Sequence, residues 1–155
     1  LFLFSCRKEV KEEIPAQKQA PKQTVKFRTY VIYYTDQELV KISPGTITLE
    51  EKEGELENIK YLLSTYFSLK KENLFPEGIS LRALYPFEDS IVVDINIPES
   101  SMPLQSIKEE LLFVEAITKT LCLNFQKYKS VNILINGSQE NKFINHIALY
   151  VNYKP

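Results

Sequence analysis

The side chains that most often carry catalysis are scarce in this sequence of 155 residues, which has one histidine, His146, and two cysteines, Cys6 and Cys122. A Ser-His-Asp or Cys-His arrangement would need His146, and no Gly-x-Ser-x-Gly turn is present to hold a nucleophilic serine. Cys122 stands in an apolar helical stretch, where a free cysteine behaves as a small hydrophobic residue. We therefore predict that both residues are structural and that the protein is not an enzyme.

A hydrolase stays open as an alternative, and it predicts a cleft in which His146 meets an acidic or hydroxyl side chain. Glu88, Asp89 and Asp94 are close in sequence, but the first two belong to a predicted turn. The four glycines form no phosphate-binding loop, and so few histidines and cysteines exclude most metal sites with several such ligands. We predict no cofactor and no metal.

Tyrosine is the residue type that best suits a binding function, because it is favoured in half-buried strands and at protein interfaces. Tyr30, Tyr33 and Tyr34 fall on one predicted strand and Tyr85 on another. Strand packing alone would explain them. A sheet face or edge that binds another protein is the functional interpretation, and the alternative is an envelope glycan or peptidoglycan fragment held by exposed tyrosines such as Tyr33 or Tyr85.

The start of the sequence is typical of the end of a lipoprotein signal peptide. Leu3 stands three residues before Cys6, and the small residue Ser5 stands immediately before it. Cys6 is therefore the predicted lipidation site, which would anchor the protein to the outside of the cell membrane. Arg7 after Cys6 would favour the outer membrane in a bacterium with two membranes. The end of a transmembrane helix is the alternative.

Residues 7–24 are rich in lysine, glutamate, glutamine and proline and have too few apolar residues to form a packing face. We predict that residues 1–24 are the anchor and a flexible polar tether, and that residues 25–155 form a single domain. The net charge of -1 argues against a nucleic-acid binder, which needs a basic excess.

The hydrophobic pattern of residues 25–155 alternates between strand and helix periods. Helices are predicted at 50–69 and 104–128, the second starting with the capping-box pair Ser106 and Glu109. Strands are predicted at 24–35, 38–42, 79–85, 91–97, 131–135 and 144–153. Pro44 and Gly45 are expected to end the second strand, and residues 46–49 to form a brief extended return. The order β-β-α-β-β-α-β-β predicts an α+β fold with two helices on one face of a mostly antiparallel sheet.

Several strings, in this order and spacing, resemble the GerMN domain family of bacterial sporulation and germination lipoproteins. They are Tyr-Val-Ile-Tyr-Tyr at 30–34, Leu-Leu at 62–63, Pro-Glu-Gly at 76–78, Ile-Val-Val-Asp-Ile at 91–95 and Val-Asn-Ile-Leu-Ile-Asn-Gly at 131–137. The resemblance covers residues 29–153. It implies an extracytoplasmic, non-catalytic domain similar to ring-building motifs, which acts in assembly with another envelope protein or with itself.

Overall fold

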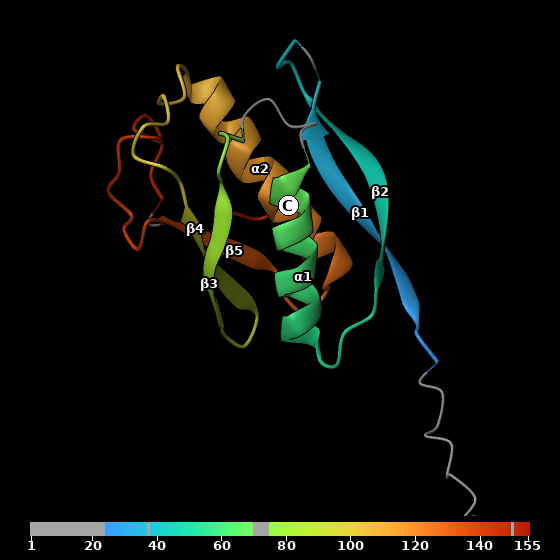
Figure 1. Ribbon diagram of the computed structural model, residues 1–155. Helices are drawn as coiled ribbons and strands as arrows, with labels where there is room; N and C mark the ends of the chain where they lie inside the picture. The colour runs from blue at the N-terminus through green and yellow to red at the C-terminus, as the bar shows by residue number, and fades with distance from the viewer. Residues whose placement is uncertain (1–23, 37, 70–74, 150) are drawn as a thin grey trace, which may run out of the picture.

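The computed structural model describes residues 24–36, 38–69, 75–149 and 151–155. Residues 1–23, with Cys6 and nearly all of the predicted tether, lie outside this description. The described chain contains five strands and two helices (Figure 1): β1 (Phe27–Thr35), β2 (Ile42–Glu50), α1 (Glu55–Ser68), β3 (Ser80–Pro86), β4 (Ser90–Asn96), α2 (Ile107–Asn124) and β5 (Ser130–Ile135).

The strands form two small sheets, one of β1 and β2 and one in the order β3-β4-β5. Both helices lie between these sheets in Figure 1; α2 contacts β1 and β5, and α1 contacts β3. The predicted α+β class is therefore confirmed. The prediction of a single sheet is wrong, because β1 and β2 form a separate layer. The predicted mostly antiparallel pairing is confirmed, since β1 pairs with β2 and β3 with β4 in antiparallel fashion, while β4 pairs with β5 in parallel.

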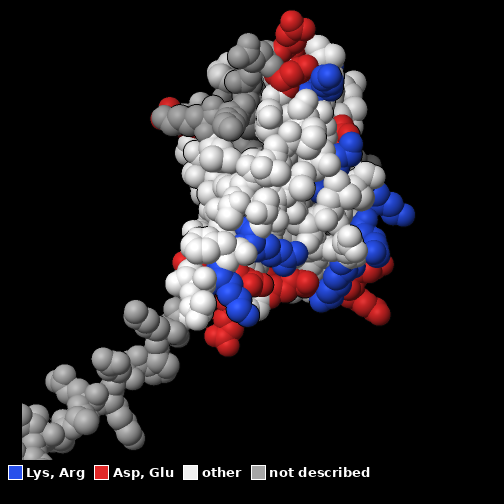
Figure 2. Space-filling model, turned by 90° about the vertical axis from the view of Figure 1, so that its right-hand side faces the viewer, with Lys and Arg blue, Asp and Glu red and all other residues white. Residues whose placement is uncertain are grey.

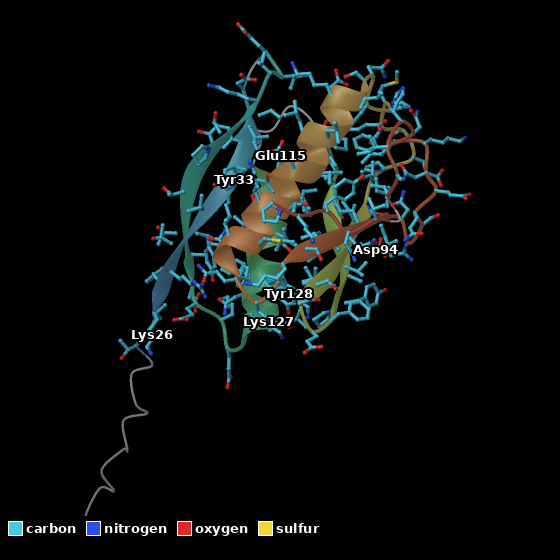
Figure 3. The ribbon with its side chains drawn as sticks, turned by 180° about the vertical axis from the view of Figure 1, so that it is seen from behind. Lys26, Tyr33, Asp94, Glu115, Lys127 and Tyr128 are labelled. Atoms are coloured by element: carbon cyan, nitrogen blue, oxygen red, sulfur yellow. The ribbon has the colours of Figure 1, made fainter. Side chains whose placement is uncertain are left out.

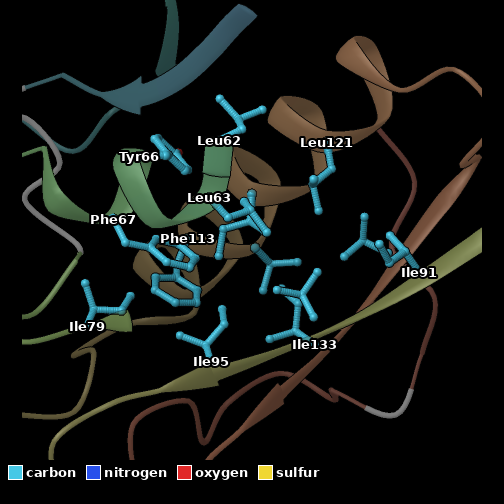
Figure 4. Packing of buried hydrophobic residues seen from close by; sticks show 14 of the residues in the cluster. Leu62, Leu63, Tyr66, Phe67, Ile79, Ile91, Ile95, Phe113, Leu121 and Ile133 are labelled. Atoms are coloured by element: carbon cyan, nitrogen blue, oxygen red, sulfur yellow. The ribbon is translucent and has the colours of Figure 1, made fainter. Parts of the chain in front are cut away.

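One hydrophobic core joins the helices to both sheets. The amphipathic pattern of α1 directs Leu62, Leu63 and Tyr66 inward, where each is at most 1% exposed. Figure 4 shows these side chains meeting residues of α2, β4 and β5, among them Phe113, Leu121, Ile91, Ile95 and Ile133. Burial of this apolar surface is the main stabilising contribution to the fold.

The helix starts differ in how they are capped. Ser106 caps α2 as predicted, since its hydroxyl accepts the N–H of Glu109 at 3.2 Å, while the Glu109 carboxylate accepts the N–H of Gln105. Helix α1 begins at Glu55 rather than at residue 50, after Gly54 with φ of 91°. Glu50, Glu51 and Glu53 therefore precede the helix. Asn58 holds this loop by accepting the N–H of Lys52 and donating to the carbonyls of Lys52 and Gly54.

Three strand predictions are wrong. Residues 38–41 do not form a strand, since β2 begins at Ile42. Pro44 and Gly45 do not break the chain but lie within β2, opposite Tyr33 and Ile32 of β1. Residues 144–153 do not form a strand; the described part of this segment makes one antiparallel bridge, between Tyr153 and Val131.

Candidate interaction surface

Helix side chains close the edge of β1 that faces away from β2. The N–H of Val31 donates to Asn124 Oδ1 at 2.9 Å, and the N–H of Tyr33 donates to Thr120 Oγ1 at 3.0 Å. The Asn124 amide also donates to the Val31 carbonyl, and the Tyr66 hydroxyl of α1 donates to the Tyr33 carbonyl. The polar groups that a third strand would normally satisfy are thus paired within the domain.

The opposite edge of the same sheet, along β2, is open in the part of the chain that the structure describes. Because Val31 and Tyr33 direct their N–H groups away from β2, their antiparallel partners Thr46 and Pro44 direct their own backbone groups outward. Thr48 has the same orientation. Pro44 fits here because an outward-facing position on an edge strand needs no N–H.

Natural proteins usually protect such an edge with charged side chains, prolines or bulges. From residue 42 to residue 49, β2 has one proline and no charged side chain. Residues 29–35 of β1, which pair with residues 42–48, are also uncharged, and Arg28 lies opposite Leu49. Figure 2 views the molecule from this side: the charged side chains lie toward the top, the bottom and the right-hand margin, and the rest of this face is mostly uncharged. We call β2 from Pro44 to Thr48, with its outward backbone groups, the β2 edge.

The tyrosines predicted as an interaction surface do not form one cluster. Tyr30 is 1% exposed, and its hydroxyl donates to Asn58 Oδ1 at 3.1 Å, so this side chain belongs to the core. Burial raises the pKa of Tyr30, although the positive charge of Arg28 partly offsets the effect. Tyr85 is 49% exposed but lies on β3, in the other sheet.

Tyr33 and Tyr34 are half-buried near the open sheet. The Tyr33 ring centroid lies 5.9 Å from the Lys119 ammonium, which pairs with Glu115 at 2.7 Å; Figure 3 labels Tyr33 and Glu115 on the adjoining β1 and α2. The Tyr34 ring lies against Gly45, where an added Cβ would come within 2.7 Å of the ring. Both rings therefore pack within the domain. The feature of this sheet that stays accessible to a partner is the β2 edge.

His146 meets an acidic side chain, as the hydrolase alternative requires. Its Nδ1 lies 2.8 Å from Oε1 of Glu110, a residue of α2 that is 0% exposed. The same carboxylate accepts the backbone N–H groups of Asn145, His146 and Ile147. Burial alone would raise the pKa of Glu110, but these hydrogen bonds lower it below its ordinary value. A carboxylate so fully used for anchoring a loop is an unsuitable proton acceptor for substrate chemistry.

The other candidate groups are placed as a structural role would require. Cys122 is buried, and burial raises the pKa of its thiol to about 11, which keeps it protonated at neutral pH. Asp94 is buried and accepts the N–H of Gly137 at 2.9 Å, while Glu88 and Asp89 are exposed. Among the described residues, no group of three or more histidine, cysteine, aspartate and glutamate side chains could hold a metal ion.

Sequence reasoning missed the residues that close the β1 edge, Thr120 and Asn124. Their signal is a pair of polar residues four positions apart in the last turns of the helix, which places both on one face. None of the described helices is both long and apolar enough to cross a membrane.

A family model described as "Germane: Sporulation and spore germination" matches residues 31–141. The chain belongs to this family. The match of this Germane chain begins within β1 and spans β2, both helices, β3 and the parallel pair of β4 and β5, so it includes the β2 edge from Pro44 to Thr48.

Among solved structures, the Germane chain is similar to the tandem GerMN domains of the sporulation protein GerM from Bacillus subtilis, with 12% identity and a TM-score of 0.56. The similar region covers 90% of this chain and 49% of that one, so the chain spans about half the length of this relative. A lipoprotein candidate from Clostridium perfringens matches with 14% identity over 84% of this chain and 87% of that one, at a TM-score of 0.47. No curated protein matches the chain.

Proposed function

We propose that this Germane-family chain is a lipid-anchored, non-catalytic module on the outside of the bacterial cell membrane, which binds an envelope protein through the β2 edge. The edge adds an extended segment of the partner as a further strand, so that main-chain hydrogen bonds supply the affinity. A second copy of the chain is the other partner that the edge can accept, since pairing two uncharged strands brings no like charges together.

The single observation that carries this proposal is the contrast between the two edges of one sheet. Side chains of Thr120, Asn124 and Tyr66 satisfy the outward backbone groups of Val31 and Tyr33. Pro44, Thr46 and Thr48 instead direct their backbone groups toward solvent, and the charged residue of β2 is Glu50 at its end. A long uncharged edge strand promotes aggregation unless it is covered or used. The first edge has been closed by the fold itself, and we infer that the second is left for a partner.

The anchor and the non-catalytic character complete the proposal. Cys6 after Leu3 and Ser5 is the proposed lipidation site, and the polar residues 7–24 are the proposed tether. Anchoring beside its partner raises the effective concentration of a binding segment, so that a modest edge affinity is sufficient. Cys122 is buried and protonated, and Glu110 is occupied by backbone donors, which leaves neither as a reactive group.

Two substitutions at one position test the edge. Thr46→Pro removes an outward N–H that the fold does not use, as Pro44 already does two residues earlier, whereas Thr46→Val keeps the N–H and the branched shape. Crosslinking in the native envelope followed by mass spectrometry should identify partner peptides on β2 in the parent and in Thr46→Val. Those crosslinks should be lost in Thr46→Pro at unchanged thermal stability. Partner crosslinks that persist in Thr46→Pro would reject the β2 edge as the binding site.

Sedimentation of the purified domain distinguishes the two kinds of partner. A second copy as partner predicts a dimer in the parent and in Thr46→Val and a monomer in Thr46→Pro. A monomer in all three, together with crosslinks that depend on Thr46, assigns the edge to another envelope protein.

A further inference from the structure

Strand β2 has outward backbone groups that a second copy of the same strand can pair with. It has nine residues, Ile42–Glu50, and Thr46 is the central one. When two copies run antiparallel with their Thr46 residues opposite each other, these two residues exchange both of their outward hydrogen bonds. The N–H of Thr48 then donates to the Pro44 carbonyl of the other copy. The outward N–H groups of Thr46 and Thr48 are thus satisfied, and Pro44 has no N–H to satisfy.

Two oppositely charged side chains stand at equal distances from Thr46 along the chain. Lys41 precedes it by five positions and Glu51 follows it by five, and both are exposed. A backbone hydrogen bond continues the β1–β2 ladder to each of them, from Asp36 N–H to the Lys41 carbonyl at 3.1 Å and from Glu51 N–H to the Lys26 carbonyl at 2.8 Å. Neither charge has an ion-pair partner in the described part of the chain. In the antiparallel pair centred on Thr46, Lys41 of each copy lies opposite Glu51 of the other, which is a favourable cross-strand pair at both ends.

Other arrangements of the two strands lose this match of charges. A shift by two residues in one direction brings Lys41 opposite the buried Leu49 of the other copy. The shift in the other direction brings Lys41 toward Glu53, which lies beyond the end of β2 in the loop before α1. Both shifts also leave one end of each strand unpaired. A parallel pair in register places Lys41 beside Lys41 and Glu51 beside Glu51, and like charges opposite each other are destabilising.

We propose that the β2 edge binds a second copy of this chain, paired in antiparallel fashion about a two-fold axis at Thr46, with Lys41 of each copy opposite Glu51 of the other. The inference rests on the proposed function and selects one of its two kinds of partner. Strand β2 lies at the outer side of the molecule in Figure 1, so the two small sheets join into one of four strands in the order β1-β2-β2-β1. Its outer strands are then β1, which helix side chains already cover at Val31 and Tyr33.

The arrangement agrees with the proposed anchor. The first residues of β1 in the two copies lie at opposite ends of the joined sheet, because the two-fold axis reverses the strand direction. Residues 7–24, the proposed tether, span at most roughly 60 Å when fully extended. A strand of nine residues is only about 30 Å long. One membrane can therefore hold both copies, with their strands along its surface.

Charge reversal at the two ion pairs tests the arrangement by sedimentation of the full chain in a Cys6→Ser background. Lys41→Glu and Glu51→Lys should each raise the dissociation constant of the dimer roughly tenfold, since each variant places like charges opposite each other at both ends. An equimolar mixture of the two variants should recover the parent constant, because each copy then supplies the charge that the other needs. An unchanged constant in the single variants, or a mixture that binds no more tightly than its components, would overturn the proposal.

Lys108→Glu is the matched control for net charge. Lys108 is an exposed lysine of α2, outside both strands of the sheet, and the substitution changes the charge of the chain as Lys41→Glu does. It should dimerise like the parent. A tenfold loss in Lys108→Glu as well would show that total charge, and not the pairing of Lys41 with Glu51, governs the association, which would also reject the arrangement.

Cysteine crosslinking in the same Cys6→Ser background tests the register. The Cα atoms of two opposed residues that exchange hydrogen bonds lie about 5.5 Å apart, within the range of a disulfide. Thr46→Cys should therefore form a disulfide dimer under mild oxidation. Thr48→Cys should not, because it lies opposite Pro44 of the other copy, and the two introduced cysteines are about 13 Å apart along the strands. Equal crosslinking of the two variants would reject the pairing centred on Thr46.

Failure of this inference can be distinguished from failure of the proposed function. A parent chain that stays monomeric at millimolar concentration, with partner crosslinks that are lost in Thr46→Pro, rejects a second copy as the occupant and keeps the β2 edge as the site for another envelope protein. A dimer that persists in Thr46→Pro and in both charge variants forms through another surface and overturns the inference.

Discussion

The carboxylate of Glu110 lies 2.8 Å from Nδ1 of His146, although the two residues are 36 positions apart in the sequence. The carboxylate is fully buried in α2 and also receives the backbone N–H groups of residues 145–147. A buried negative charge is tolerated only when it is paired and hydrogen-bonded, and these donors supply that pairing. The pair fixes the segment after β5 against the second helix.

Glu110→Gln should therefore destabilise the fold strongly. The neutral amide has one acceptor oxygen and introduces an NH2 group among donors, so several backbone N–H groups lose their partner. We expect a loss of about 2–4 kcal/mol in the free energy of unfolding, measured by urea denaturation. Glu115→Gln on the same helix is the control, since Glu115 is partly exposed and pairs with Lys119 alone. A loss as small as that of the control would contradict the anchoring role.

The stability of the protein should also fall in acid through Glu110. Its pKa is lowered in the folded state, so its contribution is fully present above the unfolded value of about 4.3 and is lost as the pH falls through the folded value. Urea midpoints of the parent should decrease from pH 6 toward pH 3. The decrease should be smaller in Glu110→Gln, which has no carboxyl to protonate there, and an identical slope in both would oppose this assignment.

The closed edge of β1 gives a second prediction of stability. Asn124→Ala removes the acceptor of the Val31 N–H and the donor to the Val31 carbonyl, and leaves both backbone groups without these partners. We expect a cost of about 2–3 kcal/mol by urea denaturation. Leu123→Ala, at the neighbouring position that is 49% exposed, should change stability by less than about 0.5 kcal/mol. Similar effects of the two substitutions would show that Asn124 does not support the edge.

The sequence was sufficient to predict the helices and strands that are defined by the hydrophobic periodicity of their own residues. The helical period placed α1 and α2, and the strand alternation placed β1 and both strands of the β3–β4 hairpin. Pro44 was misread as a break because its compatibility with a strand depends on which side of β2 the partner occupies. That information belongs to tertiary structure, as does the parallel pairing of β4 and β5.

Residues 144–153 show why alternation alone can mislead. Ile144, His146 and Ala148 occupy every second position, as residues on one face of a strand do. Near this segment, however, two side chains accept the backbone N–H groups that a neighbouring strand would otherwise bind. Asn141 takes the N–H of Ile144, and Glu110 takes those of the next residues. The hydrogen bonds that a strand would have given to a neighbour go instead to side chains. The prediction of Tyr30 as a surface residue failed for a different reason. Alternation indicates that Tyr30 lies in a strand, but it does not indicate which face of the strand is buried.

Thiol labelling gives a direct measure of the burial of Cys122. In a Cys6→Ser background, the thiol should resist an aromatic disulfide reagent at pH 8, because its pKa of about 11 leaves little thiolate and the side chain is 5% exposed. Full reaction should follow unfolding in urea. Fast labelling of the folded protein would contradict the structural role of Cys122.

The two cysteines also provide a matched test of the anchor. In a precursor with a complete signal peptide ahead of Leu1, a palmitate analogue should label the parent protein and Cys122→Ser equally. Cys6→Ser should abolish the label. Because the acyl chains would be attached to Cys6 alone, label that persists in Cys6→Ser would reject lipidation at this residue. The β2 edge would then have to reach its partner without the advantage of a shared membrane.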